Sequence, residues 1–417
     1  MTVLTSQQLA ALNAGNALSL SYSGTLNIQG PAPTAAPAPA PLAVSVKGNK
    51  LVDQTGKVIR FKGVNISALE AVPIAGWSPS DPWGGRFSST TLAALRSWTG
   101  LNAVRIPLNE ASVLGLTCYD LPIAPATVGV ARQADPGNNV ISTLKTTVAS
   151  LTAAGLYVIL DLHINSPNAA VPGIAGVVPT TPNCQNQMAD ADHSITFWTT
   201  IANNFKMSPN VVFELFNEPH IDNFVGSTGY IDPAGWKILR DGGTATAFMA
   251  GKGPGTNLLN EMVNQNWNSV GTQAMVNAIR ATGAKNVILS PGLSYNQYMQ
   301  GWATYAPVDP LKQLAASWHP YASKTDNTQP GFPTSFADVQ AILAAGYPVV
   351  PTETGDFTAA GAATWLPILL PWLDANGLGG IAWTWDVWGQ NQFNLIVDSN
   401  GTPTGGEGVL WKGWCAT

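Results

Sequence analysis

Charged residues are scarce in this sequence: Asp, Glu, Lys and Arg make up 10% of its 417 residues, against about a quarter in an average soluble protein. The formal net charge is −5 and no basic patch is present, so we expect no nucleic-acid partner. No apolar run approaches the ~18–20 residues of a membrane-spanning helix, so we expect no membrane partner. Gly, Ala, Ser, Thr and Asn carry the polarity instead, a composition common in secreted enzymes. We therefore expect an extracellular protein whose leader is absent from this sequence.

Cysteine is also rare, with only Cys118, Cys184 and Cys415. Cys118 and Cys184 both lie in loops that follow predicted strands, and a disulfide between them fits an exported protein. That pairing leaves Cys415 free in the tail. Metal binding is the weaker alternative, because no CxxC or HExxH spacing occurs and the four histidines are scattered. We expect neither a metal nor a cofactor.

The sequence divides at a Pro/Ala-rich stretch over residues 31–42, which predicts an extended, semi-rigid linker. Residues 1–30 before it contain two alternating apolar runs around a Ser-Gly turn, a pattern typical of a hairpin. Thirty residues are too few for a domain with its own core, so this segment is either the remnant of an upstream module or strands that dock elsewhere. Residues 43–417 are predicted to form the main domain.

Apolar strands alternate with helices throughout residues 43–417. Residues 44–61, with a turn at 54–56, predict a hairpin that leads into the first strand. Eight strands are predicted, at residues 61–66, 102–107, 157–163, 211–217, 286–290, 316–320, 348–353 and 380–385. Amphipathic patterns at 140–151 and 195–205 indicate two of the intervening helices. Eight such units predict an α/β fold, a (β/α)₈ TIM barrel. A doubly wound sheet is the alternative, disfavoured because no glycine-rich phosphate loop follows the first strand.

Two of the predicted strands end in a carboxylic acid. The apolar run from Asn210 ends in Asn217, Glu218 and Pro219, and a second run ends in Glu353. A carboxyl group at the exit of a buried strand is costly unless it is used. In a (β/α)₈ barrel the active site lies at the C-terminal ends of the strands, so both acids should open into one cleft. Two carboxylates on rigid strands are what hydrolysis of a glycosidic bond needs.

Side chains of functional types also occur at the exits of other strands. They are Arg105, His163, Asn217, His319, Tyr321, Trp383 and Trp385. Glu214 and Asp161 lie within strands, and we interpret both as buried structural groups, although Glu214 could compete with Glu218 as an acid. Arg105 could merely brace the barrel interior. Two long loops, from Ser67 to Ser88 and from Pro219 to Asn257, are predicted to build the substrate subsites.

Five motifs give the sequence a clear resemblance to glycoside hydrolase family 5, in the clan of retaining (β/α)₈ glycosidases whose catalytic acids end strands four and seven. The motifs are LNAVRIP at 101–107, ILDLH at 159–163, FELFNEP at 213–219, WHPY at 318–321 and TETG at 352–355. The resemblance spans roughly residues 45 to 412. It implies that Glu218 is the acid/base and Glu353 the nucleophile.

The remaining candidate residues can be given roles around these two acids. Arg105 and Tyr321 should stabilise the charge of Glu353. Asn217 resembles the donor to the sugar 2-hydroxyl, while His163 and His319 should hold hydroxyls and orient the acids. Trp385 resembles the family's sugar-stacking indole, with Trp383 as the alternative. Trp77 and Trp83, in the loop after the first strand, are candidate sugar platforms.

The sequence therefore predicts a retaining endo-β-1,4-glucanase that acts on β-glucan as a monomer. Other specificities of the family remain alternatives, because the catalytic residues are common to them: β-mannanase, xylanase, β-1,3-glucanase or a glucosidase acting on lipids. A non-catalytic glycan-binding barrel is a remote alternative, and the intact pair Glu218 and Glu353 speaks against it. A serine hydrolase is disfavoured because no GxSxG motif occurs. The two carboxyl groups should lie ~5–5.5 Å apart, as retention requires.

Overall fold

The eight predicted strands are present in a computed structural model, which describes residues 42–70, 83, 86–119, 131–166, 187–221, 226, 232–251, 261–321, 332–356, 359–387 and 393–417. The strands are β4 (Lys62–Asn65), β5 (Ala103–Asn109), β8 (Tyr157–Ile164), β9 (Val211–Glu214), β12 (Ile288–Ser290), β13 (Leu314–Trp318), β14 (Val349–Pro351) and β15 (Gly380–Ala382). The predicted segment at 1–30 and almost all of the linker at 31–42 lie outside the described residues, so these two assignments stay predictions.

The eight strands form one parallel sheet that closes into a barrel. Their order is β14-β13-β12-β9-β8-β5-β4-β15, and every neighbouring pair is parallel. The two end strands, β14 and β15, contact each other. The predicted (β/α)₈ barrel is therefore confirmed. Strands β9 and β14 end earlier than predicted, so Glu218 and Glu353 lie just beyond the last ladder residue of each strand.

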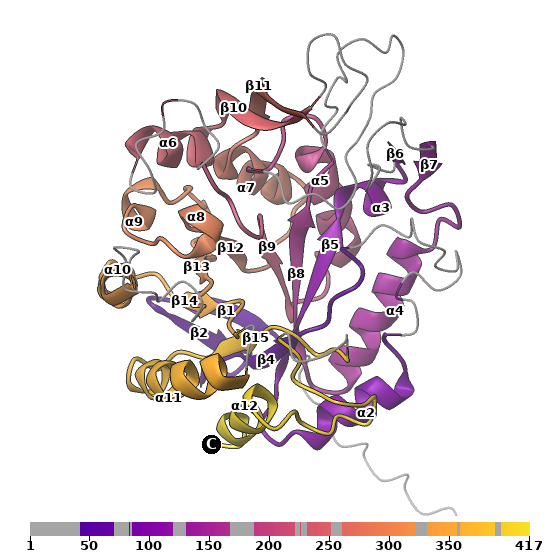
Figure 1. The fold of residues 1–417 in the computed structure, drawn as a ribbon, viewed down its shortest axis with the longest axis vertical. Coiled ribbons are helices and arrows are strands. Elements are labelled where there is room, and N and C mark those ends of the chain that lie inside the picture. Colours follow the sequence, from indigo (N-terminus) through magenta and orange to yellow (C-terminus); the bar gives the residue numbers. More distant parts are fainter. Residues whose placement is uncertain are drawn as a thin grey trace, which may run out of the picture. The chain divides into compact units, whose positions relative to one another are not determined.

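Helices surround the strands, as Figure 1 shows. They are α2 (Ser89–Ser97), α3 (Glu110–Leu114), α4 (Val140–Ala153), α5 (Ser194–Phe205), α6 (Pro233–Asp241), α7 (Thr272–Ala281), α8 (Leu293–Asn296), α9 (Trp302–Tyr305), α10 (Phe332–Ala344), α11 (Ala359–Ala375) and α12 (Glu407–Cys415). The two helices predicted from amphipathic patterns are α4 and α5, whose apolar residues are buried in the main core. Among the described residues, no helix has both the length and the apolar character needed to cross a membrane.

The barrel interior changes from apolar to polar along several strands. On β8, Tyr157 and Ile159 belong to an apolar cluster inside the barrel, whereas the next residues of the same parity, Asp161 and His163, are polar. Because alternate residues of a strand share one face, this change concentrates polar side chains at the C-terminal end. The alternation of side chains along β8, which is visible in the sequence, therefore places its polar residues at the C-terminal end of the barrel.

A small antiparallel sheet closes the opposite end of the barrel. It consists of β1 (Val44–Lys47), β2 (Lys50–Asp53) and β3 (Val58–Ile59). Val44 and Leu51 are buried in the interior apolar cluster. The predicted turn at residues 54–56 is confirmed between β2 and β3, but the sequence analysis missed a second turn at Gly48, where φ is 59°.

The predicted long loop from Pro219 to Asn257 contains regular structure, which corrects its interpretation as a loop. Helix α6 lies in this region, and its first turn is capped by Asp232, whose carboxylate accepts a hydrogen bond from the Ala234 amide. Strand β10 (Gly243–Gly251) follows and pairs with β11 (Glu261–Ser269) as a long antiparallel ribbon near the top of Figure 1. The Asp-Pro pair at 232–233 is a helix-start signal that the sequence analysis overlooked. A shorter ribbon joins β6 (Thr117–Tyr119) to β7 (Ala131–Gln133).

Candidate active site

Arg105 lies at the centre of the polar end of the barrel and is completely buried. Its guanidinium meets five side-chain acceptors. They are Glu214 at 2.6 Å, Glu353 at 2.6 Å, Asn65 at 2.9 Å, Asn217 at 2.8 Å and Asp161 at 2.8 Å. A guanidinium carries five N–H groups, so this one side chain can organise five acceptors from the ends of four strands, β4, β8, β9 and β14. Arg105 therefore does more than brace the interior, because it fixes the position of Glu353.

Three carboxyl groups compete for the charge of Arg105. Burial raises the pKa of Asp161 to about 7, although Arg105 pulls it down. Burial also raises the pKa of Glu214, again against the effect of Arg105. Burial alone would lower the pKa of Arg105, but Asp161, Glu214 and Glu353 raise it above its ordinary value. The guanidinium is therefore always charged. The excess of buried acid favours a proton on Asp161, while Glu214 accepts hydrogen bonds from Arg105 and from the Thr352 hydroxyl.

Glu353 follows β14 and is held through both carboxyl oxygens. Arg105 donates to Oε1, and the Tyr321 hydroxyl donates to Oε2 at 2.8 Å. Burial and the charge of Glu353 raise the pKa of Tyr321 well above its ordinary value, so the phenol keeps the hydrogen that it donates. Hydrogen bonds to both oxygens therefore fix the orientation of the Glu353 carboxyl group. The contacts predicted between Arg105, Tyr321 and Glu353 are present.

Glu218 follows β9, and backbone bonds beyond the strand hold its segment in place. The amides of Leu215 and Asn217 donate to the carbonyls of Leu289 and Leu162. The Glu218 side chain is 15% exposed, more than that of Glu353 at 5%. Its Oε1 lies 2.9 Å from His319 Nδ1. Glu218 thus stands at the rim of the site, where the leaving group of a substrate could reach it.

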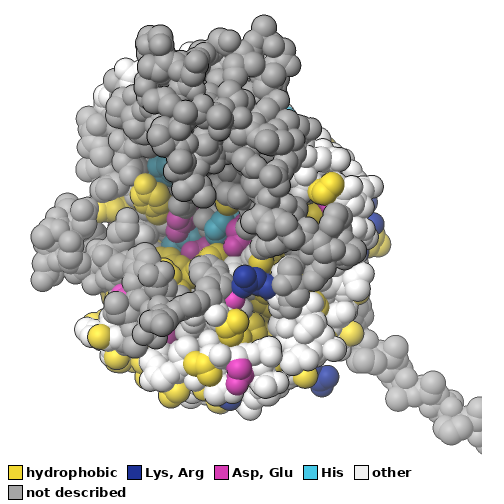
Figure 2. Space-filling model, turned by 45° about the vertical axis from the view of Figure 1, so that its right-hand side comes forward, with side chains coloured by type: hydrophobic (Ala, Val, Ile, Leu, Met, Phe, Trp, Pro, Cys, Tyr) yellow, Lys and Arg dark blue, Asp and Glu magenta, His cyan; other side chains and the backbone are white. Residues whose placement is uncertain are grey.

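Two histidines flank the acids in their neutral form. His163 Nδ1 lies 2.8 Å from Asp161 Oδ2, and its Nε2 lies 3.3 Å from the Asn217 amide nitrogen. Burial lowers the pKa of both His163 and His319 to about 4. Figure 2 shows acidic and histidine side chains gathered in a hollow of the surface. Near neutral pH, each histidine is therefore uncharged and can donate one hydrogen bond and accept another.

The structure reverses the preference between the two C-terminal tryptophans. Trp383 stacks on His163, with ring centroids 5.5 Å apart and 13° between the planes, and keeps part of its surface exposed. Trp385 is only 4% exposed and packs edge-on against Trp98. A sugar platform needs an open face, so Trp383 replaces Trp385 as the candidate.

The structure describes one of the two loop tryptophans that were predicted to be sugar platforms. Trp83 is 1% exposed and packs near Phe87, so its ring has no open face for a sugar, which corrects its prediction as a platform. Trp77 lies outside the described residues.

Cys118 lies in β6 and not in a loop, and its predicted partner Cys184 lies outside the described residues, so the disulfide stays a prediction. Cys415 is a free, buried cysteine, and burial raises its pKa to about 12.

Two site residues were missed by the sequence analysis. Asn65, at the end of β4, accepts from Arg105 and donates to the carbonyls of Thr352 and Ala382. Thr352 donates to Glu214 at 2.7 Å and lies 3.1 Å from His319 Nε2. Both residues are polar and stand at strand exits, so the rule that found Glu218 and Glu353 could have found them.

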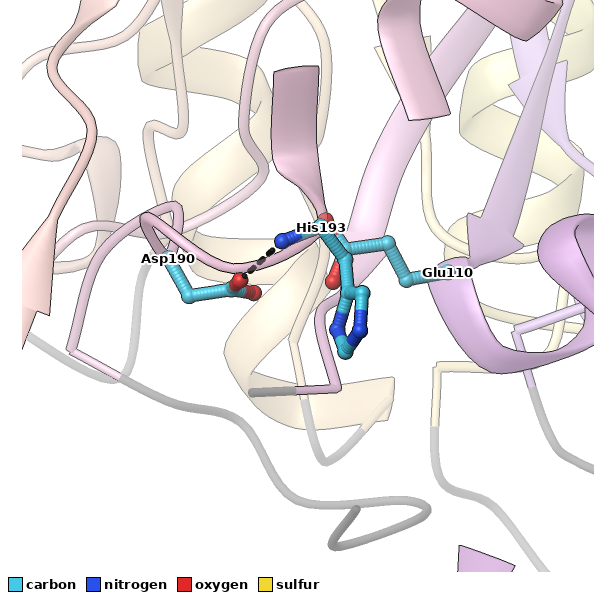
Figure 3. A group of neighbouring side chains, drawn as sticks. All are labelled: Glu110, Asp190 and His193. Carbon is cyan, nitrogen blue, oxygen red and sulfur yellow. Dashed lines mark hydrogen bonds between the residues drawn. The ribbon is translucent and has the colours of Figure 1, made fainter. Parts of the chain in front are cut away.

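Two groups of described residues have the spacing that a metal ion needs. In each group, the ligand atoms lie within 4.8 Å of one another; the groups are Glu218, His319 and Glu353, and Glu110, Asp190 and His193. The first group belongs to the acid pair already described. The second, which Figure 3 shows between α3 and the start of α5, lies outside the predicted site.

Hydrogen bonds within the protein account for the second group. Glu110 accepts from the Ser166 amide at 2.8 Å and from the Ser194 hydroxyl at 2.6 Å, while Asp190 accepts from the His193 amide at 2.7 Å. Burial and the neighbouring Asp190 raise the pKa of Glu110 well above its ordinary value. Burial and Asp190 thus favour a protonated Glu110, and we assign this pair a structural role at the start of α5.

Known proteins are similar to this chain in sequence. A "Major extracellular endoglucanase" of Xanthomonas campestris pv. campestris is 30% identical over 174 residues, which are 41% of this chain and 31% of that protein. "Endoglucanase N" of Pectobacterium atrosepticum is 26% identical over 203 residues, 49% of this chain and 33% of that protein. The chain thus spans about a third of the length of these relatives.

Solved structures agree on the fold. A β-glucanase from Saccharophagus degradans in complex with cellotetraose is 20% identical, with a TM-score of 0.58, and the match covers 90% of this chain and 93% of that one. The family described as "Cellulase (glycosyl hydrolase family 5)" matches residues 52–389. That match includes all eight barrel strands together with Glu218 and Glu353. The chain therefore belongs to glycosyl hydrolase family 5.

Proposed function

We propose that this chain is a retaining endo-β-1,4-glucanase in which Glu353 is the nucleophile and Glu218 the acid/base. The proposal is carried by the geometry of the two carboxyl groups. An oxygen of Glu218 and an oxygen of Glu353 lie within 4.8 Å of each other. Retaining enzymes hold their carboxyl groups ~5–5.5 Å apart, whereas inverting enzymes leave ~6.5–9.5 Å for a water molecule. The short separation supports a double displacement.

The environments of the two acids support their different roles. Arg105 and Tyr321 donate to both oxygens of Glu353, which orients this carboxyl group as a nucleophile needs. Glu218 is more exposed and faces a neutral His319, an environment that tolerates a protonated acid. The asymmetry therefore matches one nucleophile and one proton donor.

Two steps follow from this arrangement. A Glu353 oxygen attacks the anomeric carbon while the bond to the leaving sugar breaks and its oxygen takes the proton of Glu218. A covalent glycosyl ester of Glu353 results. The Glu218 carboxylate then takes a proton from water, the water oxygen bonds to the anomeric carbon, and Glu353 leaves as a carboxylate. Two inversions give retention.

Asn217, His163 and Trp383 are placed to bind the sugar. The Asn217 carbonyl oxygen accepts from Arg105, and its amide nitrogen lies next to His163 Nε2. This orientation leaves a second amide hydrogen for a sugar hydroxyl, a contact that strengthens in the transition state. The partly exposed ring of Trp383 stands beside His163 and offers an apolar face to a pyranose.

The substrate class is supported by the relatives. The names of two of them describe endoglucanases, and a structural neighbour was crystallised with cellotetraose. We propose β-1,4-glucan as the substrate, in preference to mannan, xylan or β-1,3-glucan. We also propose that the protein acts outside the cell, as its extracellular Xanthomonas relative does, and that it acts as a monomer.

Hydrolysis of carboxymethylcellulose, mannan, xylan, laminarin and lichenan, with the products sized, tests the substrate. Internal cleavage of carboxymethylcellulose is expected; activity confined to another glycan would refute it. Proton NMR of the first product should show the β-anomer, and initial release of the α-anomer would rule out retention. Azide should rescue Glu218→Ala as a β-glycosyl azide, because azide needs no base. Rescue of Glu353→Ala as an α-azide would reverse the two roles.

A further inference from the structure

A chain of hydrogen bonds connects the acid/base to the central arginine. Glu218 Oε1 lies 2.9 Å from His319 Nδ1, and His319 Nε2 lies 3.1 Å from the Thr352 hydroxyl. Thr352 donates to Glu214 Oε1 at 2.7 Å, and Glu214 Oε2 accepts from Arg105 Nε at 2.6 Å. Except for Glu218, all members are buried. Glu214 is therefore connected to Glu218 through two intermediate side chains, Thr352 and His319.

Each contact in this chain has a fixed direction. Arg105 can only donate, and an ionised Glu214 can only accept, from Arg105 on one oxygen and from Thr352 on the other. The Thr352 hydroxyl spends its only hydrogen on Glu214, so its oxygen must accept from His319 Nε2–H. A neutral imidazole carries one N–H, and a lone pair is therefore left on Nδ1, the nitrogen that faces Glu218.

We propose that Glu214 is a positioning residue that keeps the proton on Glu218 by fixing the tautomer of His319. This proposal rests on the proposed role of Glu218 as the acid/base. A protonated Glu218 can donate to the Nδ1 lone pair, whereas an ionised Glu218 would face that lone pair without a hydrogen between them. The chain thus favours the protonated acid that the first step consumes.

One neighbouring charge opposes this arrangement: Glu353 Oε2 lies 3.6 Å from His319 Nδ1 and favours a hydrogen on that nitrogen. The other neighbouring charges act in the same direction or are balanced. Glu218 also faces Glu353 and interacts electrostatically with Asp161, and negative charge on these neighbours favours its protonated form. Glu214 faces Arg105, Asp161 and, at 4.0 Å, His319. Burial raises the pKa of Glu214 while Arg105 lowers it. A protonated Glu214 would donate to Thr352 and reverse the chain, which makes the direction measurable.

Glu214→Gln should reverse the donor and acceptor roles along the hydrogen-bond chain. The Gln carbonyl must accept from Arg105, so its amide hydrogens face Thr352, and Thr352 then donates to His319 Nε2. His319 should move its hydrogen to Nδ1 and donate to an ionised Glu218. In ¹⁵N NMR of histidine-labelled enzyme, the hydrogen-bearing nitrogen of His319 should be Nε2 in the wild type and Nδ1 in Glu214→Gln. The alkaline limb of kcat/KM should shift down by about one pH unit, because a hydrogen bond to the carboxylate lowers its pKa.

Matched variants distinguish an effect of this hydrogen-bond chain from a general loss of structure or activity. Thr352→Ser keeps the hydroxyl and should keep the wild-type tautomer and pH profile. Asp161→Asn removes another carboxyl from Arg105, but one outside the chain, so it should lower activity without moving the His319 hydrogen. A wild-type His319 with its hydrogen on Nδ1 would overturn the proposal without any variant. So would a Glu214→Gln enzyme with unchanged tautomer and alkaline limb. Full activity of Glu218→Gln would instead refute the proposed function. The position of the His319 hydrogen measured by NMR does not depend on that result.

Discussion

Arg105→Lys should destabilise the fold severely, although it conserves the charge. The guanidinium reaches five acceptors, whereas a Lys ammonium has three N–H groups on a point charge. At least two buried acceptors must therefore lose their partner. An unsatisfied buried polar group costs ~1–3 kcal/mol, so the free energy of unfolding should fall by about 2–6 kcal/mol. That is a large share of the ~5–15 kcal/mol that typically holds a protein folded.

The loss should also grow as the pH rises. The pKa of Asp161 is raised to about 7 in the folded protein, so the stability that its protonated form contributes is complete below ~4 and is lost as the pH rises through about 7. Arg105 limits this loss because it lowers the pKa values of Asp161 and Glu214. A lysine that reaches fewer carboxylates leaves these pKa values higher, and the variant should fall further behind the wild type between pH 4 and 7.

Equilibrium unfolding in guanidinium chloride, followed by tryptophan fluorescence at pH 4.5 and 7, measures both effects. Arg60→Lys is the matched control, because Arg60 pairs with Asp374 at the surface, where its side chain is 29% exposed. Surface pairs contribute ~0–1 kcal/mol, so this control should be nearly neutral at both pH values. If Arg105→Lys costs less than ~1 kcal/mol, or if its cost does not depend on pH, the account of Arg105 as the shared partner of the buried acids is wrong.

Three further predictions follow from the site and its surroundings. Trp383→Ala should raise KM for cellotetraose by about tenfold with little loss of stability, since one stacked sugar face contributes ~1.5 kcal/mol. Trp385→Ala should instead lower the melting temperature, because Trp385 is buried. Similar KM changes in both variants would contradict the choice of Trp383 as the sugar platform. Glu110→Gln should gain stability over the wild type as the pH rises, because the stability that the raised pKa of Glu110 contributes is complete below ~4.3 and is lost as the carboxyl ionises. Melting curves of both proteins at pH 5 and 9 measure this, and an unchanged difference would argue against a protonated Glu110. Non-reducing peptide mapping should find Cys118 joined to Cys184, and two free thiols would refute the pairing.

The polar strand exits could be predicted from the sequence because a barrel strand exposes its last residues at one face. Arg105, Glu218 and Glu353 were found in this way. Their mutual contacts could not be predicted, because they depend on how neighbouring strands are aligned. Asn65 lies opposite Arg105, and Asp161 lies opposite Glu214, through the register of their strands. No local pattern encodes that alignment.

The choice between Trp383 and Trp385 failed for a related reason. The predicted strand extended to Trp385, and alternation would then have given both tryptophans the same face as Ile381. The observed strand ends at Ala382, and the Trp385 amide instead donates to the carbonyl of Asn65. Beyond the end of a strand the two-residue period no longer applies, so spacing alone cannot orient a side chain there.

Closure of the barrel between β4 and β15 has a consequence for the order of folding. Gly380 pairs with Lys62, and the Trp411 indole of α12 donates to the carbonyl of Gly63. These contacts join residues more than 300 positions apart in the sequence, so they carry the largest loop-closure entropy in the sheet. During synthesis, β4 keeps an unpaired edge until the segment containing β15 has left the ribosome. Partly made chains therefore expose a strand edge that can pair with other chains, and chaperone binding during translation should protect β4 above all.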